Sequence, residues 1–206
     1  MASIAAVHWT GESIVQLLRT RRDLGATAGT LGPVAANIDI KVHTIASLTA
    51  GALPTSGLGL ISYAMTQSEH SKAAARSPSA PPRAEIALEL LYLLASWSGK
   101  TEEEQANLAW AMLELSSHSV LDASTLKGGA GVWESGETDQ VAPEPLGPEE
   151  QFKIWDAIGQ NYRLSIGLRA RVLRLRGPIG PDHPKIVSSR FHMADEAALL
   201  AGEHAS

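Results

Sequence analysis

Residues 162–175 constrain the fold of this chain most, because polar and apolar side chains alternate along them. The apolar positions are Leu164, Ile166, Leu168, Ala170 and Val172, and the intervening positions are Arg163, Ser165, Gly167, Arg169 and Arg171. Successive side chains of a strand point to opposite faces, so the pattern predicts a long strand with one buried face. The alternation changes phase at Val172 and Leu173, which predicts a bulge or an exit from the sheet there.

Four further segments are candidate strands of the same sheet. Residues 37–45 alternate apolar and polar side chains, and residues 57–65 are bounded by turn-forming and polar residues. Residues 85–97 also alternate, but their many leucines permit a helix, and periodicity alone does not decide between the two. Residues 141–146 contain two prolines, which restrict them to an edge strand or an extended connection.

Three helices are expected beside these strands. The first has Ile14, Leu17 and Leu18 on one face, with Thr10 as its N-cap and Gly25 as its end. The second begins with a capping box at residues 101–104 and ends near residue 118. Its expected apolar face is Ala106, Ala109, Trp110 and Leu113. The third begins at residues 147–148, and its expected apolar face is Phe152, Trp155 and Ile158.

These elements predict an α/β (α+β) fold: a mixed, largely antiparallel β-sheet flanked by about three helices. Residues 122–138 are rich in glycine and serine and are expected to form a surface loop. Residues 67–83 contain several prolines and are expected to form a long exposed loop or arm. The expected division is a domain of residues 1–177 followed by a C-terminal extension or arm, residues 178–206.

Composition excludes several classes of protein. The chain has 206 residues, of which 44% are hydrophobic, so it is expected to fold around a core. It has no cysteine, which rules out disulfides, thiolate metal sites and cysteine nucleophiles. The 17 Lys and Arg against 22 Asp and Glu give a net charge of −5, so no general binding of nucleic acid is expected. No segment is typical of a secretory signal or a membrane helix, which makes a cytoplasmic location the default.

The sequence lacks the common catalytic and cofactor motifs. Its seven histidines are scattered and do not form the paired spacing of a zinc-protease helix. The glycines at 128–131 lack the Lys and Ser/Thr that follow in a phosphate-binding loop, and no Gly-x-Ser-x-Gly elbow is present. We therefore expect no catalytic, metal or cofactor site and no enzymatic activity.

One cluster exceeds what an ordinary surface shows. It consists of the arginines of the last strand, Arg163, Arg169, Arg171, Arg174 and Arg176. A period of two places Arg163, Arg169 and Arg171 on one side of that strand. The cluster is either a solvated strand face or an interface with an acidic protein surface, with nucleic acid a smaller third alternative. Trp133, in the glycine-rich loop, is the one tryptophan expected to anchor a contact.

The order of elements, and three stretches within it, resemble a known family. The stretches are the apolar run from Ile86 to a Trp at 97, the Pro-x-Pro-Leu and acidic Trp-bearing segment at 142–156, and the alternating run that begins at Tyr162. Each is similar to its counterpart in the cap, or tail-terminator, proteins of phage-tail-like contractile injection systems of the antifeeding-prophage and virulence-cassette type. The resemblance covers roughly residues 56–176.

The resemblance implies a tail-terminator-like fold and a structural role without catalysis. It implies a homo-oligomer, a six-subunit ring, that closes the inner tube and the contractile sheath and so has tube and sheath subunits as partners. Neither nucleic acid nor a membrane is an expected partner. The expected location is cytoplasmic, within an assembled particle that is released from the cell in some systems. The alternative is a small adaptor or binding domain whose arginine-rich strand holds an anionic ligand or nucleic acid.

Overall fold

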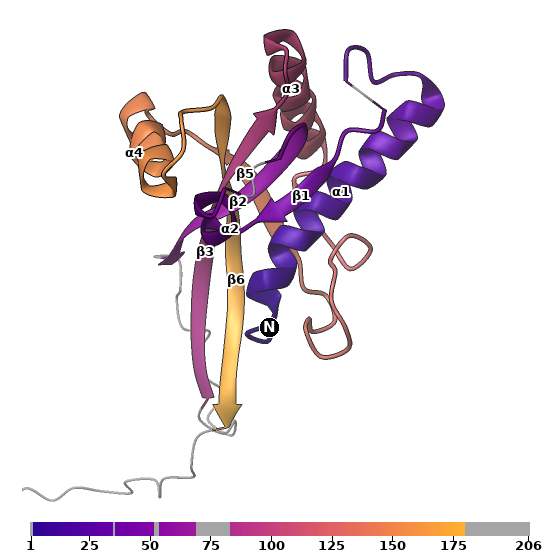
Figure 1. Cartoon of the computed structure of the whole chain (residues 1–206). Coiled ribbons are helices and arrows are strands. Elements are labelled where there is room, and N and C mark those ends of the chain that lie inside the picture. The colour runs from indigo at the N-terminus through magenta and orange to yellow at the C-terminus, as the bar shows by residue number, and fades with distance from the viewer. Residues whose placement is uncertain (1, 35, 52–53, 69–82, 180–206) are drawn as a thin grey trace, which may run out of the picture.

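A six-stranded mixed sheet forms the centre of the protein (Figure 1). The computed structural model describes residues 2–34, 36–51, 54–68 and 83–179, without the side chains of residues 83, 84, 172 and 176–179. The strands are β1 (Ile40–His43), β2 (Gly57–Gln67), β3 (Arg83–Trp97), β4 (Val120–Leu121), β5 (Asp139–Glu144) and β6 (Ser165–Ile179), in the spatial order β1-β2-β3-β6-β5-β4. Only β1 and β2 are parallel, so the expectation of a largely antiparallel sheet is confirmed.

Within the described part of the chain, four helices cover the two faces of this sheet. They are α1 (Ala6–Ala28), α2 (Ile45–Thr49), α3 (Thr101–Ser117) and α4 (Pro148–Ile158). Helices α1 and α3 pack on one face through a large core that includes Leu18, Leu60 and Leu108. Helices α2 and α4 pack on part of the other face, where Trp97 and Trp155 meet with ring centroids 6.1 Å apart. We call this second side of the sheet the outer face.

Strand β1 is shorter than expected because a helix begins directly after it. The expected strand at 37–45 is a strand only over Ile40–His43, and Ile45 starts α2. Thr44 turns the chain, because its side-chain oxygen accepts a hydrogen bond from the backbone N–H of Ser47 at 3.1 Å. This N-cap lies in a short polar-flanked segment without helical periodicity, so α2 was not anticipated.

Helix α1 is longer at both ends than the sequence suggests. It begins four residues before Thr10, which is therefore not the N-cap but a buried helical residue whose hydroxyl donates to the Ala6 carbonyl at 3.0 Å. It also passes through Gly25 and ends at Gly29, which has a φ of 68°. A Cβ at Gly25 would lie 2.7 Å from the end of the Leu31 side chain, which packs closely against the helix there.

Helix α3 starts as expected, but its cap and its buried face differ from the prediction. Lys100 is the N-cap residue, and the Glu104 carboxylate accepts from the backbone N–H of Ser98 at 3.1 Å, so Thr101 forms no capping box. The buried positions are Asn107, Leu108, Ala111 and Leu115, whereas Ala109 and Leu113 of the predicted face are exposed. The buried Asn107 amide donates to Ser96 of β3 at 3.3 Å, which helps fix the helix in this rotation.

Strands β3 and β6 are the two longest strands and pair along most of their length. In Figure 1 they run side by side beyond the ends of the other strands. Opposite Leu88 and Leu90 of β3, strand β6 places Leu173 and Ala170, so it holds one additional residue there. This confirms the bulge predicted from the phase change at Val172 and Leu173.

Other predicted elements are confirmed with small shifts. Residues 57–65 and 85–97 are strands, residues 122–138 contain no helix or strand, and β5 is the extended segment that its prolines suggested. The strand expected to begin at 162 begins at Ser165 and continues to Ile179. Most of the expected arm, residues 69–82, and nearly all of the expected extension, residues 180–206, lie outside the described residues.

Candidate interaction surface

Among the described residues, the outer face of the sheet is covered at one end and open at the other. Trp155 of α4 covers the end near Ser165, to which its indole N–H donates at 3.1 Å. Further along, Arg169, Arg171 and Arg174 of β6 lie on the same face as Glu89 of β3. We call this region the open part of the outer face. It is the place where the structure brings three of the six predicted site residues together.

Arg169 is engaged within its own sheet. One guanidinium N–H₂ donates to Glu89 of β3 at 2.9 Å, and the other donates to Glu144 of β5. Glu89 also accepts from the Ser68 hydroxyl at 3.2 Å. The hydrogen bond from Arg169 to Glu144 contributes most to raising the pKa of the guanidinium. Arg169 therefore ties the three neighbouring strands together and has little capacity left for an external carboxylate.

Arg171 and Arg174 are exposed on the same face of β6. Three positions separate them, which in a regular strand would place them on opposite faces, but the bulge restores the phase. Leu168, Ala170, Leu173 and Leu175 point into the main core on the other side. Arg169, Arg171 and Arg174 therefore share one face of β6, and the bulge determines which arginines are displayed together.

Arg163 is separated from this stripe. It precedes β6, and its Cζ atom lies 5.8 Å from the ring centroid of Trp97, in cation–π contact. Its guanidinium is also 3.6 Å from the carboxylate of Glu104 on α3. Arg176 lies in β6 opposite Glu85, and its side chain is outside the described residues. The five arginines thus do not form one surface.

Trp133 lies in the loop between β4 and β5 and is half-buried against the main core. Its indole N–H donates to the Lys127 carbonyl at 2.6 Å, so the side chain closes the glycine-rich loop on itself. The same loop is fixed to α1, because the backbone N–H of Lys127 donates to the Ser13 hydroxyl at 2.7 Å.

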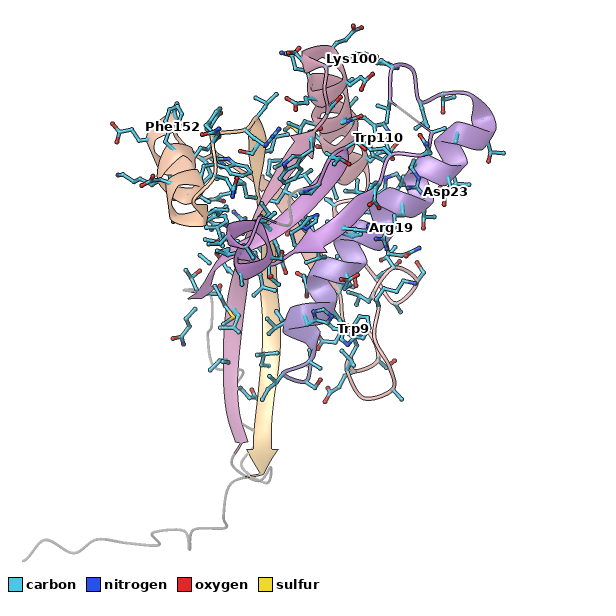
Figure 2. All side chains as sticks on the ribbon, in the orientation of Figure 1. Trp9, Arg19, Asp23, Lys100, Trp110 and Phe152 are labelled. Carbon is cyan, nitrogen blue, oxygen red and sulfur yellow. The ribbon has the colours of Figure 1, made fainter. Side chains whose placement is uncertain are left out.

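An exposed aromatic pair on α4 is a feature that the sequence pattern missed. Phe152 was expected to face the core with Trp155 and Ile158, but it is 54% exposed, whereas Trp155 and Ile158 are buried. Its ring centroid lies 4.6 Å from that of Tyr162. Figure 2 shows Phe152 at the side of the molecule away from α1. The two rings line a groove of about 440 Å³ together with Lys153, Asp156 and other residues.

The outward side of α4 is acidic. Glu149 and Glu150 lie in its first turn and Asp156 in its last turns, and all three are exposed. The position near the positive end of the helix dipole stabilises the first two by about 0.3–1 kcal/mol each. Lys153 is the single cation on this side of the helix.

Neither a metal-binding cluster nor a membrane-spanning helix is present among the described residues. No group of three His, Cys, Asp or Glu side chains among them is placed to hold a metal ion. Within the same residues, every helix is too short or too polar to cross a membrane.

A family profile described as the Pvc16 N-terminal domain matches residues 10–189. The chain belongs to this family. The Pvc16 profile covers all six strands and all helices except the start of α1, so the family resemblance seen in the sequence is confirmed. It also extends past residue 177, the expected end of the domain. Comparison with curated proteins gave no significant match.

Two solved structures are similar to this Pvc16-family chain. One is titled "Cryo-EM Structure of an Extracellular Contractile Injection System, PVC sheath/tube terminator in extended state", with 15% identity and a TM-score of 0.45. The other is titled "Cryo-EM structure of the anti-feeding prophage cap (AFP tube terminating cap)", with 11% identity and a TM-score of 0.46. The first match covers 89% of this chain and 68% of that chain, and the second covers 82% and 60%.

Proposed function

We propose that this chain is a structural cap protein that forms a ring and terminates the inner tube and contractile sheath of a phage-tail-like contractile injection system. The observation that carries the proposal is the match of residues 10–189 to the Pvc16 N-terminal domain family. It agrees with the three stretches that resemble tail-terminator proteins, which form β3, the β5–α4 segment and β6.

The proposal includes a hexameric ring, tube and sheath subunits as partners, and a role without catalysis. It places the chain in the cytoplasm as part of the assembled particle, before any release of that particle. Residues 178–206 are proposed as an extension of the cap domain, and β6 runs into the first two of them. Among the described residues, the exposed aromatic pair and the unpaired arginines of β6 supply surfaces for protein contacts.

Deletion of the gene from a cell that makes such particles tests this function. Without a terminator, tubes and sheaths should lose their uniform length or fail to remain assembled, which negative-stain imaging measures. Restoring the wild-type gene should restore the length distribution. Particles of unchanged length and unchanged ends after deletion would contradict the proposal.

The anionic-ligand alternative has a weaker structural basis than the sequence suggested. Of the arginines expected to hold the ligand, Arg169 is already paired with Glu89 and Glu144, and Arg163 lies elsewhere. Binding of nucleic acid would weaken steeply with salt, because phosphate contacts release counterions. Tight, salt-sensitive binding of a DNA or RNA oligonucleotide by the purified chain would favour the alternative over the cap.

A further inference from the structure

Arg171 and Arg174 are distinguished from the other described arginine side chains by having no partner. Arg19 donates to the Ile40 carbonyl, and the other four each pair with a carboxylate: Arg21 with Glu114, Arg22 with Asp23, Arg163 with Glu104 and Arg169 with Glu89 and Glu144. In the described part of the chain, no hydrogen bond or ion pair involves the guanidinium groups of Arg171 and Arg174. A forked donor of this kind binds carboxylates best, so the open part of the outer face suits an acidic protein surface.

Helix α4 carries the acidic surface that fits it. Five acidic side chains in the described residues have no ion pair or hydrogen bond, and three of them are Glu149, Glu150 and Asp156 of α4. Beside them lies the exposed Phe152–Tyr162 pair, and exposed aromatic rings are typical anchors of protein interfaces. The outward side of α4 thus combines three carboxylates, one ammonium and an apolar anchor.

The two complementary surfaces lie apart on one face of the same molecule. Trp155 fixes α4 over Ser165, which is six residues before Arg171 and nine before Arg174 along β6. At 3.3 Å per residue this is about 20–30 Å, with Arg169 and its two carboxylates in between. Among the described residues, no hydrogen bond or ion pair joins the α4 carboxylates to these arginines within one copy, so the contact is left to another copy. A contact between two different surfaces of identical chains is head-to-tail and closes into a ring when its rotation permits.

We propose that α4 of one copy docks on the open part of the outer face of the next copy, with Glu149, Glu150 and Asp156 opposite Arg171 and Arg174. This inference rests on the ring of the proposed function and specifies the contact that builds it. The partner is a second copy of this chain, and Arg169 takes no part because it holds β3, β5 and β6 together within each copy.

Two full-length charge-reversal variants test the contact. The first is Arg171→Glu with Arg174→Glu, and the second is Glu149→Lys with Glu150→Lys. Each variant alone should lose the ring, with association on the order of 100-fold weaker than wild type. An equal mixture should assemble, because every contact in an alternating ring then joins opposite charges. Native mass spectrometry reports the species, and the mixture should give even-numbered rings with equal amounts of the two variants.

Matched reversals at other exposed, unpaired charges provide the controls. Lys127→Glu in the glycine-rich loop and Glu102→Lys at the start of α3 should leave the ring intact. Thermal melting should show all variants folded. Rings that persist in either double variant, or a mixture that does not assemble, would overturn the contact. If only the arginine variant loses its ring and the α4 variant keeps it, α4 is not the partner of these arginines.

The outcomes also separate this inference from the proposed function. If wild type and both double variants all form rings, the contact is overturned and the cap function still stands. A wild-type chain that stays monomeric would overturn the contact as well, and the gene deletion would then decide the function by itself.

Discussion

Replacing Asp139 by asparagine should stabilise the protein at neutral pH, because the native side chain is a buried carboxyl group. Asp139 begins β5 and is 2% exposed beneath α1. Its Oδ2 atom lies 3.3 Å from the Thr10 hydroxyl oxygen, and its Oδ1 atom has no hydrogen-bond partner among the described residues. Burial raises the pKa of Asp139 from 3.8 to about 7, against the lowering effect of the neighbouring Thr10 hydroxyl and Gln140 backbone N–H.

The sign and size of this stability change follow from the thermodynamic linkage between protonation of Asp139 and folding. Between pH 4 and pH 7 the carboxyl group ionises in the unfolded chain but stays protonated in the folded one, so stability falls as pH rises. At about 1.4 kcal/mol per pKa unit, the whole loss is on the order of 4 kcal/mol and is complete above pH 7. Between pH 5 and pH 7.5 the same relation gives a loss of about 2–3 kcal/mol.

Urea denaturation at these two pH values measures the effect. Other carboxylates titrate in both proteins, so the difference between Asp139→Asn and wild type isolates this group. Relative to wild type, the free energy of unfolding of the variant should increase by about 2–3 kcal/mol as pH rises from 5 to 7.5. The exposed Glu102→Gln, outside the proposed ring contact, is the control and should follow wild type at both pH values. An Asp139→Asn variant with the same pH dependence as wild type would refute the assignment of a buried, protonated carboxyl group.

Three further predictions concern packing, and urea denaturation measures them all. Trp155→Ala should cost about 3–5 kcal/mol because the ring is fully buried, and the half-buried Trp133→Ala should cost clearly less; the reverse order would contradict the two placements. Arg169→Ala should cost about 1–3 kcal/mol by leaving two carboxylates unpaired, whereas Arg171→Ala should stay within about 0.5 kcal/mol; equal costs would contradict the network. Gly167→Ala should cost about 1–3 kcal/mol because its Cβ would lie 2.5 Å from a β5 carbonyl oxygen, and a neutral effect would exclude that close approach.

Local patterns predicted most of the sheet. The alternation that ends near Leu175 and its phase change were sufficient to place β6 and its bulge, because one buried face dictates the period of a strand. Strand β3 was harder, since Leu93 and Leu94 are both buried by layers on opposite faces. A strand covered on both sides loses its alternation, and for this reason the sequence left a helix open there.

Helix rotation and helix ends depended on distant contacts that no local pattern contains. Asn107 is buried because its amide donates a hydrogen bond to Ser96. Phe152 is exposed because its ring packs against Tyr162 and not against the core. Thr10 resembles an N-cap in sequence, yet its hydroxyl bonds to Asp139, 129 positions away. Tertiary partners of this kind override local preference.

The sequence predicted a stripe of arginines but not what each arginine contacts. Sequence spacing placed Arg169 and Arg171 on one face, and the structure confirms this. Spacing does not show that Glu89 and Glu144 flank Arg169 from the neighbouring strands, because cross-strand register is needed for that. It also grouped Arg163 with the stripe, although Arg163 precedes β6 and contacts Trp97.

The position of this chain on an intact particle is the most direct test of the cap function. Particles assembled with an epitope-tagged chain can be labelled with gold-conjugated antibody and imaged by negative stain, with untagged particles as the control. We predict gold at one end only, where tube and sheath stop together. Gold along the length of the sheath, gold at both ends, or tagged chain found only off the particles would contradict the cap function.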